Sequence, residues 1–212
     1  MKVGIVANGP ATLLPDLSLY DQIDVWIGAD RGAFVLLEKG LDVDYAVGDF
    51  DSMDNAEKKA VKENAGIFKI YPSEKDETDL ELAILEAMEL RPDTVLLFGA
   101  TGGRMDHTLV NIQILARFAE NGIAAKLIDR TNTIELALPG SHTLTNDPEY
   151  PYISFIPMTP TVTGLTLQHF YYPLENETIS FGSTLCVSNK LIANSGTFSI
   201  DEGIVLVIKS RD

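Results

Sequence analysis

The sequence predicts an α/β fold, with a doubly wound and largely parallel sheet followed by a smaller antiparallel β-sandwich domain. In the first part of the chain, short runs rich in β-branched residues alternate with helical patterns, as in parallel sheets joined by helices. In the remainder, prolines and aromatic residues accumulate and long helical patterns cease, which favours short antiparallel strands. We therefore expect two domains, residues 1–129 and residues 130–212.

The first domain is expected to alternate strands with helices. Its strands are predicted at Val3–Ala7, Val25–Ala29, Val43–Val47, Ile67–Tyr71, Val95–Phe98 and Ala124–Ile128. The clearest helices are Thr78–Leu90 and Arg104–Glu120, because apolar residues recur along one face of each. Asn121 and Gly122 are typical residues for the end of the second helix. The ligand crevice of such a sheet lies outside the carboxyl ends of its strands.

The second domain is expected to contain short strands separated by Pro, Gly and Asn turns. Six of the ten prolines and eight of the sixteen Phe and Tyr residues follow residue 130, so long helices are not expected. Strands are predicted at Thr133–Leu138, Tyr152–Ile156, Thr184–Val187 and Ile204–Ile208. Cys186, the single cysteine, is expected in the core of this domain.

The composition excludes several classes of partner. A formal net charge of −15 argues against nucleic acid and anionic membranes, since both require a basic surface. No apolar run approaches the roughly 20 residues that span a bilayer. The single cysteine agrees with a reducing compartment, and we expect a cytoplasmic protein. If it binds a polyphosphate, a divalent metal must balance the charge, and a cationic co-substrate would be attracted.

Polar residues gather where each predicted strand of the first domain ends. The segments are Asn8–Pro10, Asp30–Gly32, Asp49 to Asp51, Lys75–Asp79 and Gly99–Asp106. Because the carboxyl ends of parallel strands meet at one edge of a sheet, we expect these residues to lie close together. The arrangement predicts a metal or phosphate site at this edge.

Two aspartates one residue apart, Asp49 and Asp51, suggest the ligand. Alternate residues of a strand point the same way, and two close carboxylates repel unless a cation lies between them, which suits Mg²⁺ bridging to a phosphate. A solvated turn with two acids is the structural alternative. Asp79 could supply a third carboxylate, while Thr78 and nearby N–H groups hold phosphate oxygens. Capping of the helix by Asp76 explains part of this segment without a ligand.

The loop before the second clear helix is rich in glycine. Gly99, Gly102 and Gly103 let backbone N–H groups approach an anion, Arg104 can pair with phosphate, and Asp106 can turn toward the same crevice. His107, on the first turn of that helix, is more typical of a structural residue than of a catalyst.

Four segments, in this order and spacing, resemble thiamin pyrophosphokinases. They are Gly28–Gly32, Val47–Ser52, Lys75–Asp79 and Gly102–His107. The resemblance implies an α/β catalytic domain followed by a β-sandwich domain that binds thiamin, and a homodimer. The implied reaction moves the pyrophosphoryl group of ATP to the hydroxyethyl oxygen of thiamin, giving AMP and thiamin diphosphate.

The resemblance also implies roles for individual residues. Asp49, Asp51 and Asp79 would hold Mg²⁺ and, with Asp106, form the catalytic group. The implied ATP-binding residues are Asn8, Asp30, Arg31, Lys75, Asp76, Thr78, Thr101, Gly102, Gly103 and Arg104. Thiamin would contact Asp106, Ser188 and Asn189. Either Asp30 or Asp106 could be the general base.

The sequence departs from the family at one point. Animal members place a tryptophan near the end of the last domain to stack on thiamin's pyrimidine ring, whereas this chain has Ile204 there and its only tryptophan is Trp26. We therefore expect the pyrimidine to be held in another way.

Two other classes of function are alternatives to this one. A dehalogenase-like phosphatase also places D-x-D after a strand, but its nucleophile follows the first strand, where this chain has Asn8 and Gly9. A non-catalytic nucleotide-sensing module would have little need of so many acids together with a second β domain.

Overall fold

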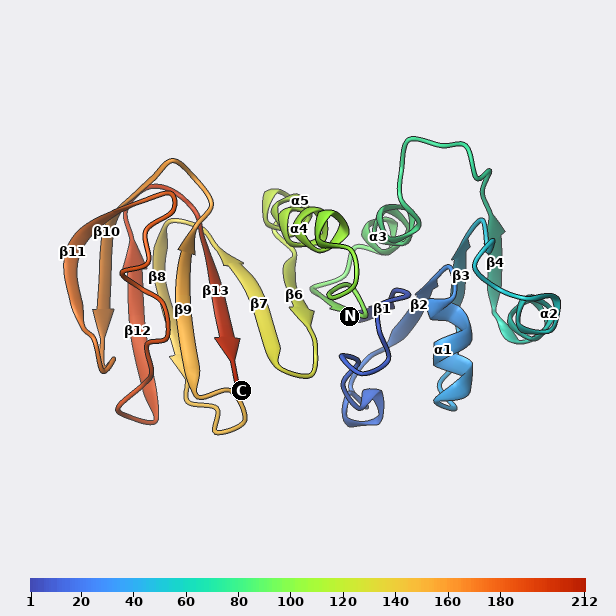
Figure 1. Ribbon diagram of the computed structural model, residues 1–212, viewed down its shortest axis with the longest axis horizontal. Coiled ribbons are helices and arrows are strands. Elements are labelled where there is room, and N and C mark those ends of the chain that lie inside the picture. The colour runs from blue at the N-terminus through green and yellow to red at the C-terminus, as the bar shows by residue number, and fades with distance from the viewer. The chain divides into compact units, whose positions relative to one another are not determined.

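The computed structural model describes all 212 residues, and these form two compact units, Met1–Arg130 and Thr131–Asp212. In Figure 1 the first unit runs from blue to yellow-green and the second from yellow to red. None of the helices combines the length and the apolar character needed to cross a lipid bilayer.

The first unit is built on a parallel sheet with the strand order β4-β3-β2-β1-β5-β6. Its strands are β1 (Lys2–Val6), β2 (Val25–Ala29), β3 (Tyr45–Gly48), β4 (Ile67–Ile70), β5 (Thr94–Phe98) and β6 (Ala124–Ile128). All six predicted strands are present, with ends that differ by at most two residues. The strand order changes direction between β1 and β5, which is where sheets of this kind bind ligands.

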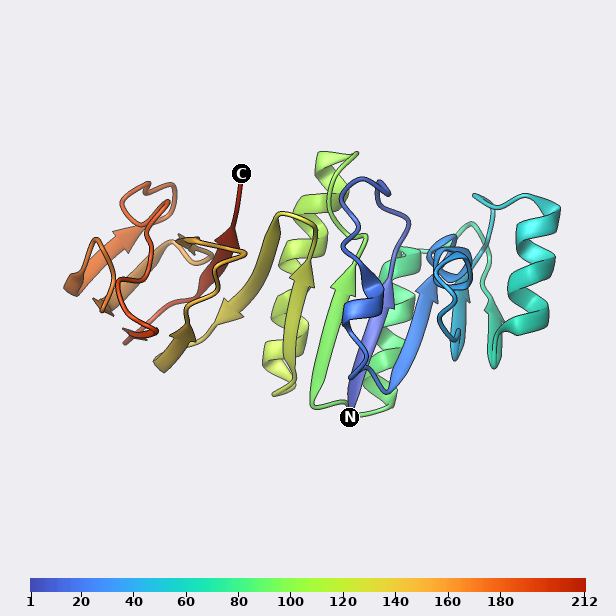
Figure 2. The same ribbon diagram turned by 90° about the horizontal axis from the view of Figure 1, so that it is seen from below.

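Helices cover both faces of this sheet. They are η1 (Leu17–Leu19), α1 (Gly32–Glu38), α2 (Asn55–Asn64), α3 (Asp79–Glu89), α4 (Met105–Gln113) and α5 (Leu115–Glu120). Figures 1 and 2 show α1 on one face and α3, α4 and α5 on the other, which confirms the doubly wound prediction.

The helix predicted at Arg104–Glu120 is two helices, so that prediction was wrong at Ile114. The N–H of Ile114 still donates to the Val110 carbonyl, but the N–H of Arg117 donates to Ile114, one residue closer than in an α-helix. Ile114 keeps helical backbone angles, so the apolar pattern continues through the junction and does not reveal it. The cap of α3 also differs: the hydroxyl of Thr78 accepts from the N–H of Glu81, so Thr78 rather than Asp76 begins that helix.

The second unit consists of two antiparallel groups of strands. These are β7 (Asn132–Ala137), β13 (Val205–Ser210) and β9 (Tyr152–Pro157) in one, and β11 (Leu174–Ser180), β10 (Thr161–Gln168), β12 (Ser195–Ile200) and β8 (Gly140–Thr145) in the other. Their apolar faces share one core, in which the ring of Phe155 on β9 lies 5.0 Å from that of Phe198 on β12. The predicted β-sandwich is therefore confirmed.

The strand predicted at Thr184–Val187 is absent, and this segment forms turns. Leu185 and Val187 are exposed, while Cys186 alone is buried, and burial raises the pKa of its thiol to about 11. The segment contacts the core through the side chain of Cys186 and through a hydrogen bond from the Phe155 N–H to the Cys186 carbonyl, 3.0 Å long. A short β-branched run thus buries one residue without entering a sheet.

Candidate functional site

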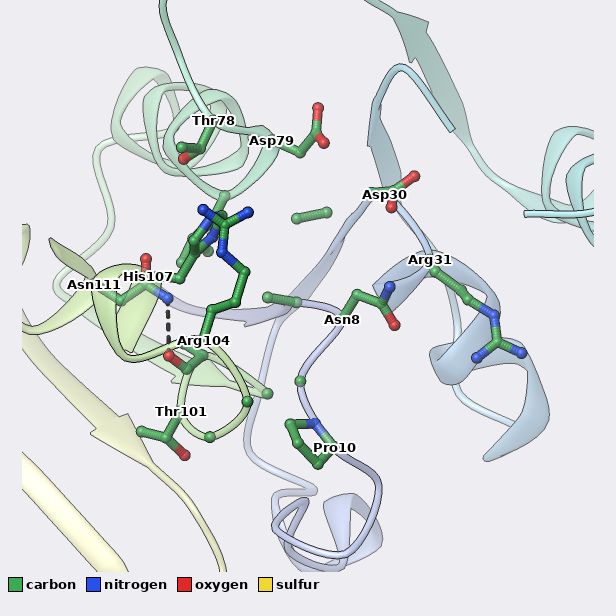
Figure 3. A pocket seen from close by; sticks show the side chains of 18 of the residues that line it. Asn8, Pro10, Asp30, Arg31, Thr78, Asp79, Thr101, Arg104, His107 and Asn111 are labelled. Carbon is green, nitrogen blue, oxygen red and sulfur yellow. Dashed lines mark hydrogen bonds between the residues drawn. The ribbon is translucent and has the colours of Figure 1, made fainter. Parts of the chain in front are cut away.

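A pocket of about 1010 Å³ lies at the carboxyl edge of the parallel sheet (Figure 3). The segments that follow β1, β2, β3, β4 and β5 all contribute to it. The predicted site residues that line it are Asn8, Asp30, Arg31, Asp49, Lys75, Thr78, Asp79, Thr101, Gly102, Gly103 and Arg104. Asp51, Asp76 and Asp106, also predicted, are not among its lining residues.

Tight backbone turns bring the carboxylates to this edge. Asp30 has a left-handed φ of 49°, in the turn from β2 into α1. A side chain at Gly32 would come within 1.9 Å of the Val6 carbonyl oxygen, so the start of α1 packs directly on β1. A side chain at Gly48 would approach a carboxylate oxygen of Asp79 to 3.3 Å, so this glycine leaves room for α3 to begin beside β3.

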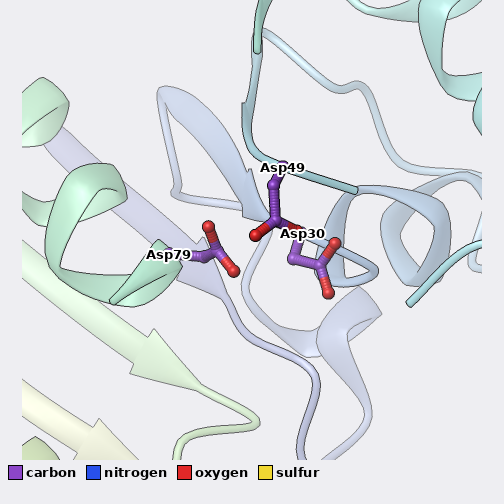
Figure 4. A group of neighbouring side chains, drawn as sticks. All are labelled: Asp30, Asp49 and Asp79. Atoms are coloured by element: carbon purple, nitrogen blue, oxygen red, sulfur yellow. The ribbon is translucent and has the colours of Figure 1, made fainter. Parts of the chain in front are cut away.

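Three carboxylates converge in the pocket: Asp30, Asp49 and Asp79 (Figure 4). One oxygen from each lies within 4.8 Å of the others. Oδ1 of Asp30 is buried and accepts no hydrogen bond, and the buried Oδ1 of Asp79 has only the ammonium group of Lys75 beside it, at 3.0 Å. Carboxylate oxygens are the ligands that Mg²⁺ prefers, and buried oxygens without hydrogen-bond donors suit a cation. The donor set therefore fits a divalent metal.

The environment separates the pKa values of two of these groups. Burial, with the carboxylates of Asp49 and Asp30 nearby, raises the pKa of Asp79 despite the favourable effect of Lys75. The pKa of Asp49 is lowered, chiefly because its Oδ1 accepts from the N–H of Asp51 at 3.0 Å, and also because it contacts Lys75. Lys75 acts in the same direction on both groups, so the opposite shifts reflect the burial of Asp79 and the backbone N–H group that donates to Asp49.

A lysine lies within this acidic group. Nζ of Lys75 is 3.1 Å from Oδ2 of Asp49 and 3.0 Å from Oδ1 of Asp79. The contact with Asp79 is an ion pair whose geometry does not meet that of a hydrogen bond. The side chain of Lys75 is only 11% exposed, so water screens these charges weakly.

Asp51 is not part of this group and instead contacts the loop after β4. It is exposed and accepts a 2.7 Å hydrogen bond from the hydroxyl of Ser73. β3 ends at Gly48 and Phe50 has a left-handed φ of 60°, so the alternation of a strand no longer applies to Asp49 and Asp51. The structure instead places Asp30, predicted as an ATP-binding residue, beside Asp49 and Asp79.

Arg104 and Asp106 pair with each other at the start of α4. Arg104 donates to both carboxylate oxygens of Asp106, at 3.1 and 2.6 Å, and the backbone N–H of His107 donates at 2.9 Å. These contacts lower the pKa of the exposed Asp106 to about 2, with the Arg104 hydrogen bonds as the largest cause. Asp106 is therefore ionised at neutral pH and engaged by Arg104.

Two residues of α4 that were not predicted as site residues also line the pocket. His107 and Asn111 are four residues apart and so share a helix face, and Nδ2 of Asn111 donates to the Ala100 carbonyl at 2.8 Å (Figure 3). The sequence held one sign of this: both residues follow the glycine-rich loop closely, and their spacing of four places them on the same face of the helix. Figure 3 also shows the guanidinium of Arg31 directed away from Asp79, and it donates to Glu57 at 2.6 Å.

In the second unit, Ser188 and Asn189 occupy contrasting environments. Asn189 is 2% exposed, its side-chain Oδ1 accepts from the N–H groups of Tyr172 and Lys190, and its Nδ2 donates to the Tyr172 carbonyl. Its side chain therefore holds the loop in place. Ser188 is exposed, with a left-handed φ of 58°.

Comparison with known proteins covers both units. Residues 17–127 match the family described as thiamin pyrophosphokinase, catalytic domain, and residues 141–205 match thiamin pyrophosphokinase, vitamin B1 binding domain. The chain is 45% identical over 211 residues to thiamine pyrophosphokinase of Bacillus subtilis, covering 99% of each chain.

Solved structures give the same result. The crystal structure of the Bacillus subtilis thiamine pyrophosphokinase superposes with a TM-score of 0.95 over 100% of both chains, at 45% identity. That of thiamin pyrophosphokinase from Geobacillus thermodenitrificans gives a TM-score of 0.90 at 44% identity, over 100% of this chain and 98% of the other. The family resemblance of the four sequence segments is confirmed, and the chain belongs to the thiamin pyrophosphokinase family.

Proposed function

We propose that the protein transfers the pyrophosphoryl group of ATP to the hydroxyethyl oxygen of thiamin, giving thiamin diphosphate and AMP. The observation that carries this proposal is the 45% identity to a thiamine pyrophosphokinase along essentially the whole of both chains. A phosphatase or a nucleotide-sensing module is not favoured, because neither would be expected to match a thiamin-binding domain as well as a catalytic one.

The pocket of the first unit supports ATP as the donor. Its volume of about 1010 Å³ is sufficient for a nucleotide. Lys75, Arg104 and the first turn of α3 present positive charge or N–H groups along its wall, which suits the phosphate chain. The cationic thiazolium of thiamin is attracted to a protein of net charge −15.

We propose that Asp49 and Asp79 hold Mg²⁺, while Asp30, the third carboxylate of the group, lies beside the metal without binding it. Asp51 stays a predicted metal residue that reaches the group only if the loop after β3 rearranges. When bound, the metal would neutralise phosphate charge during transfer. The protein's own groups position the phosphates and the alcohol and accept the alcohol's proton.

Of the two candidate bases, we favour Asp30. A base needs a carboxylate oxygen free to accept the proton of the thiamin hydroxyl. Oδ1 of Asp30 has no hydrogen-bond donor, whereas both oxygens of Asp106 accept from Arg104. Ser52 donates to the other oxygen of Asp30 and so orients the carboxylate.

Attack at the β-phosphorus predicts the products. In a reaction with ATP, thiamin and Mg²⁺ followed by ³¹P NMR, AMP and a diphosphate ester are expected to appear together, without ADP. A reaction lacking thiamin is the control and should release neither. ADP as the main product would mean transfer of the γ-phosphoryl group, and phosphate release without thiamin would indicate a phosphatase.

We propose further that the protein is a homodimer. α4 has no buried residue, and its apolar side chains Met105, Leu109 and Val110 are more than half exposed. The second unit also exposes large apolar side chains, among them Tyr172 and Phe181. Contact with a second copy would remove such surface from water. A cytoplasmic location stays a prediction.

A shared site in this dimer is testable by mixing two inactive variants. Asp49→Asn damages the first unit, and Ser188→Arg, at an exposed position, blocks the second without breaking the hydrogen bonds of Asn189. Random pairing makes about half of the dimers mixed, each with one intact site if the two chains share sites, so about a quarter of wild-type activity should return. Both variants must first be shown to fold and to be inactive. No recovery, with mixed dimers verified by mass spectrometry, would contradict the shared site.

A further inference from the structure

The ammonium group of Lys75 lies between two carboxylates of the proposed metal site. Its Nζ approaches Oδ2 of Asp49 and Oδ1 of Asp79 to within 3.1 Å, and it donates to the Pro72 carbonyl at 3.1 Å. The same carboxylates would be the ligands of a divalent cation. The ammonium group of Lys75 therefore neutralises the negative charge that would otherwise attract a metal.

A metal and this ammonium cannot use the same oxygens together. An ion bound by both Asp49 and Asp79 would stand within a few ångströms of Nζ, where two positive charges with little water between them repel strongly. When the metal binds, the ammonium group must leave these oxygens, and the long, flexible side chain of Lys75 allows it to do so. Its neighbours Ser73, Glu74, Asp76 and Glu77 are all exposed, in the connection between β4 and α3.

A displaced Lys75 would have a new partner in the same pocket. Its side chain already lines the cavity together with Thr78, which begins α3. An ammonium group offers three N–H donors on a flexible stem, which suits the oxygens of a phosphate chain.

We propose that Lys75 competes with the divalent metal for Asp49 and Asp79. When metal and nucleotide bind together, its ammonium group leaves the carboxylates and contacts the nucleotide phosphates. This inference rests on the proposed metal and ATP site. It makes Lys75 a positioning residue with two opposite effects: it weakens binding of the metal alone and strengthens binding of the nucleotide.

The first test measures binding of Mn²⁺, used in place of Mg²⁺, by electron paramagnetic resonance without nucleotide. Lys75→Met should bind Mn²⁺ about tenfold more tightly than the wild type, because the metal no longer displaces an ion pair. Lys75→Gln, which lacks the charge but keeps N–H donors, should behave in the same way. Lys69→Met is the matched control: it removes an ion pair with Glu86 from the same unit, outside the pocket, and should leave Mn²⁺ affinity unchanged.

The second test measures binding of a non-hydrolysable ATP analogue at saturating Mn²⁺. Here Lys75→Met should bind about tenfold more weakly than the wild type, because a phosphate contact is lost. Replacing a residue that only supports the fold would not strengthen Mn²⁺ binding and weaken nucleotide binding at the same time. Thermal unfolding of each variant, with and without Mn²⁺, checks that the comparison is made on folded protein.

The possible failures are distinct. If the wild type binds Mn²⁺ and Lys75→Met binds it equally or more weakly, the competition is refuted while the metal site stands. If Lys75→Met binds Mn²⁺ more tightly but binds the nucleotide as the wild type does, the proposed contact of Lys75 with the phosphates is refuted. If neither the wild type nor any variant binds Mn²⁺, the proposed metal site fails and the inference fails with it.

Discussion

Replacing Asp49 or Asp79 with Asn is expected to lower turnover by at least about 100-fold while the protein remains folded. Each substitution removes one negative charge from the group formed with Asp30 and keeps the size of the side chain. Such a loss acts on the transition state, in which phosphate charge must be balanced at fixed positions. The measurement is kcat for AMP formation at saturating ATP, thiamin and Mg²⁺.

Asp54→Asn is the matched control. Asp54 caps α2, accepting from the N–H groups of Ala56 and Glu57, and it does not line the pocket. Asn is an equally good helix cap, so both activity and stability should be unchanged. Wild-type turnover from Asp49→Asn and Asp79→Asn would remove both residues from the site. Asp51→Asn, tested beside them, decides whether that carboxylate joins the group during turnover.

The stability of Asp79→Asn provides a check with a defined sign. The pKa of Asp79 is raised by folding, so its ionised form opposes folding, and the unfavourable contribution grows as the pH rises past the ordinary carboxyl pKa. In buffer without divalent metal at pH 7, the variant should therefore unfold at a temperature no lower than the wild type.

Phe155→Ala is expected to cost about 3–5 kcal/mol of the free energy of unfolding, because it removes a fully buried ring and leaves a cavity. Phe155 is 0% exposed, and its ring contacts those of Phe170 and Phe198 at 5.6 and 5.0 Å. It therefore joins the two groups of strands in the second unit. Chemical denaturation followed by circular dichroism measures the loss.

Phe181→Ala is the control for this substitution. Phe181 lies in the same unit but is 71% exposed, so its truncation should change the unfolding free energy by less than about 0.5 kcal/mol. Fluorescence of Trp26, the only tryptophan and a core residue of the first unit, reports separately on that unit. Equal stability of the two variants would mean that the packing of Phe155 contributes little.

The central strands of the first unit could be predicted from sequence because they are buried on both faces. The runs that form β1, β2 and β5 are almost wholly apolar, and every residue but the first of each is buried. Several strands of the second unit lack this signal. β11, with the sequence LENETIS, buries only Ile179, and pairing with β10 rather than local preference makes it a strand.

The sequence predicts which segments form the site, because the order of strands along the chain determines which strand ends meet at the sheet edge. The sheet edge collects Asp30, Asp49 and Asp79 because parallel strands all end there. Backbone angles decide which carboxylates face one another. The left-handed φ angles of Asp30 and Phe50 are examples, and the residue types do not predict them. Both positions hold non-glycine residues, for which this conformation is uncommon.

The burial of Cys186 makes the chain a convenient host for site-specific probes. A thiol with a pKa of about 11 is almost entirely protonated at neutral pH, and its 3% exposure also keeps reagents away. A cysteine introduced at the exposed Glu74 would therefore be the one group labelled by a maleimide dye. A dye at that position would report the movement of the β4–α3 connection in real time, with no native residue removed from the pocket.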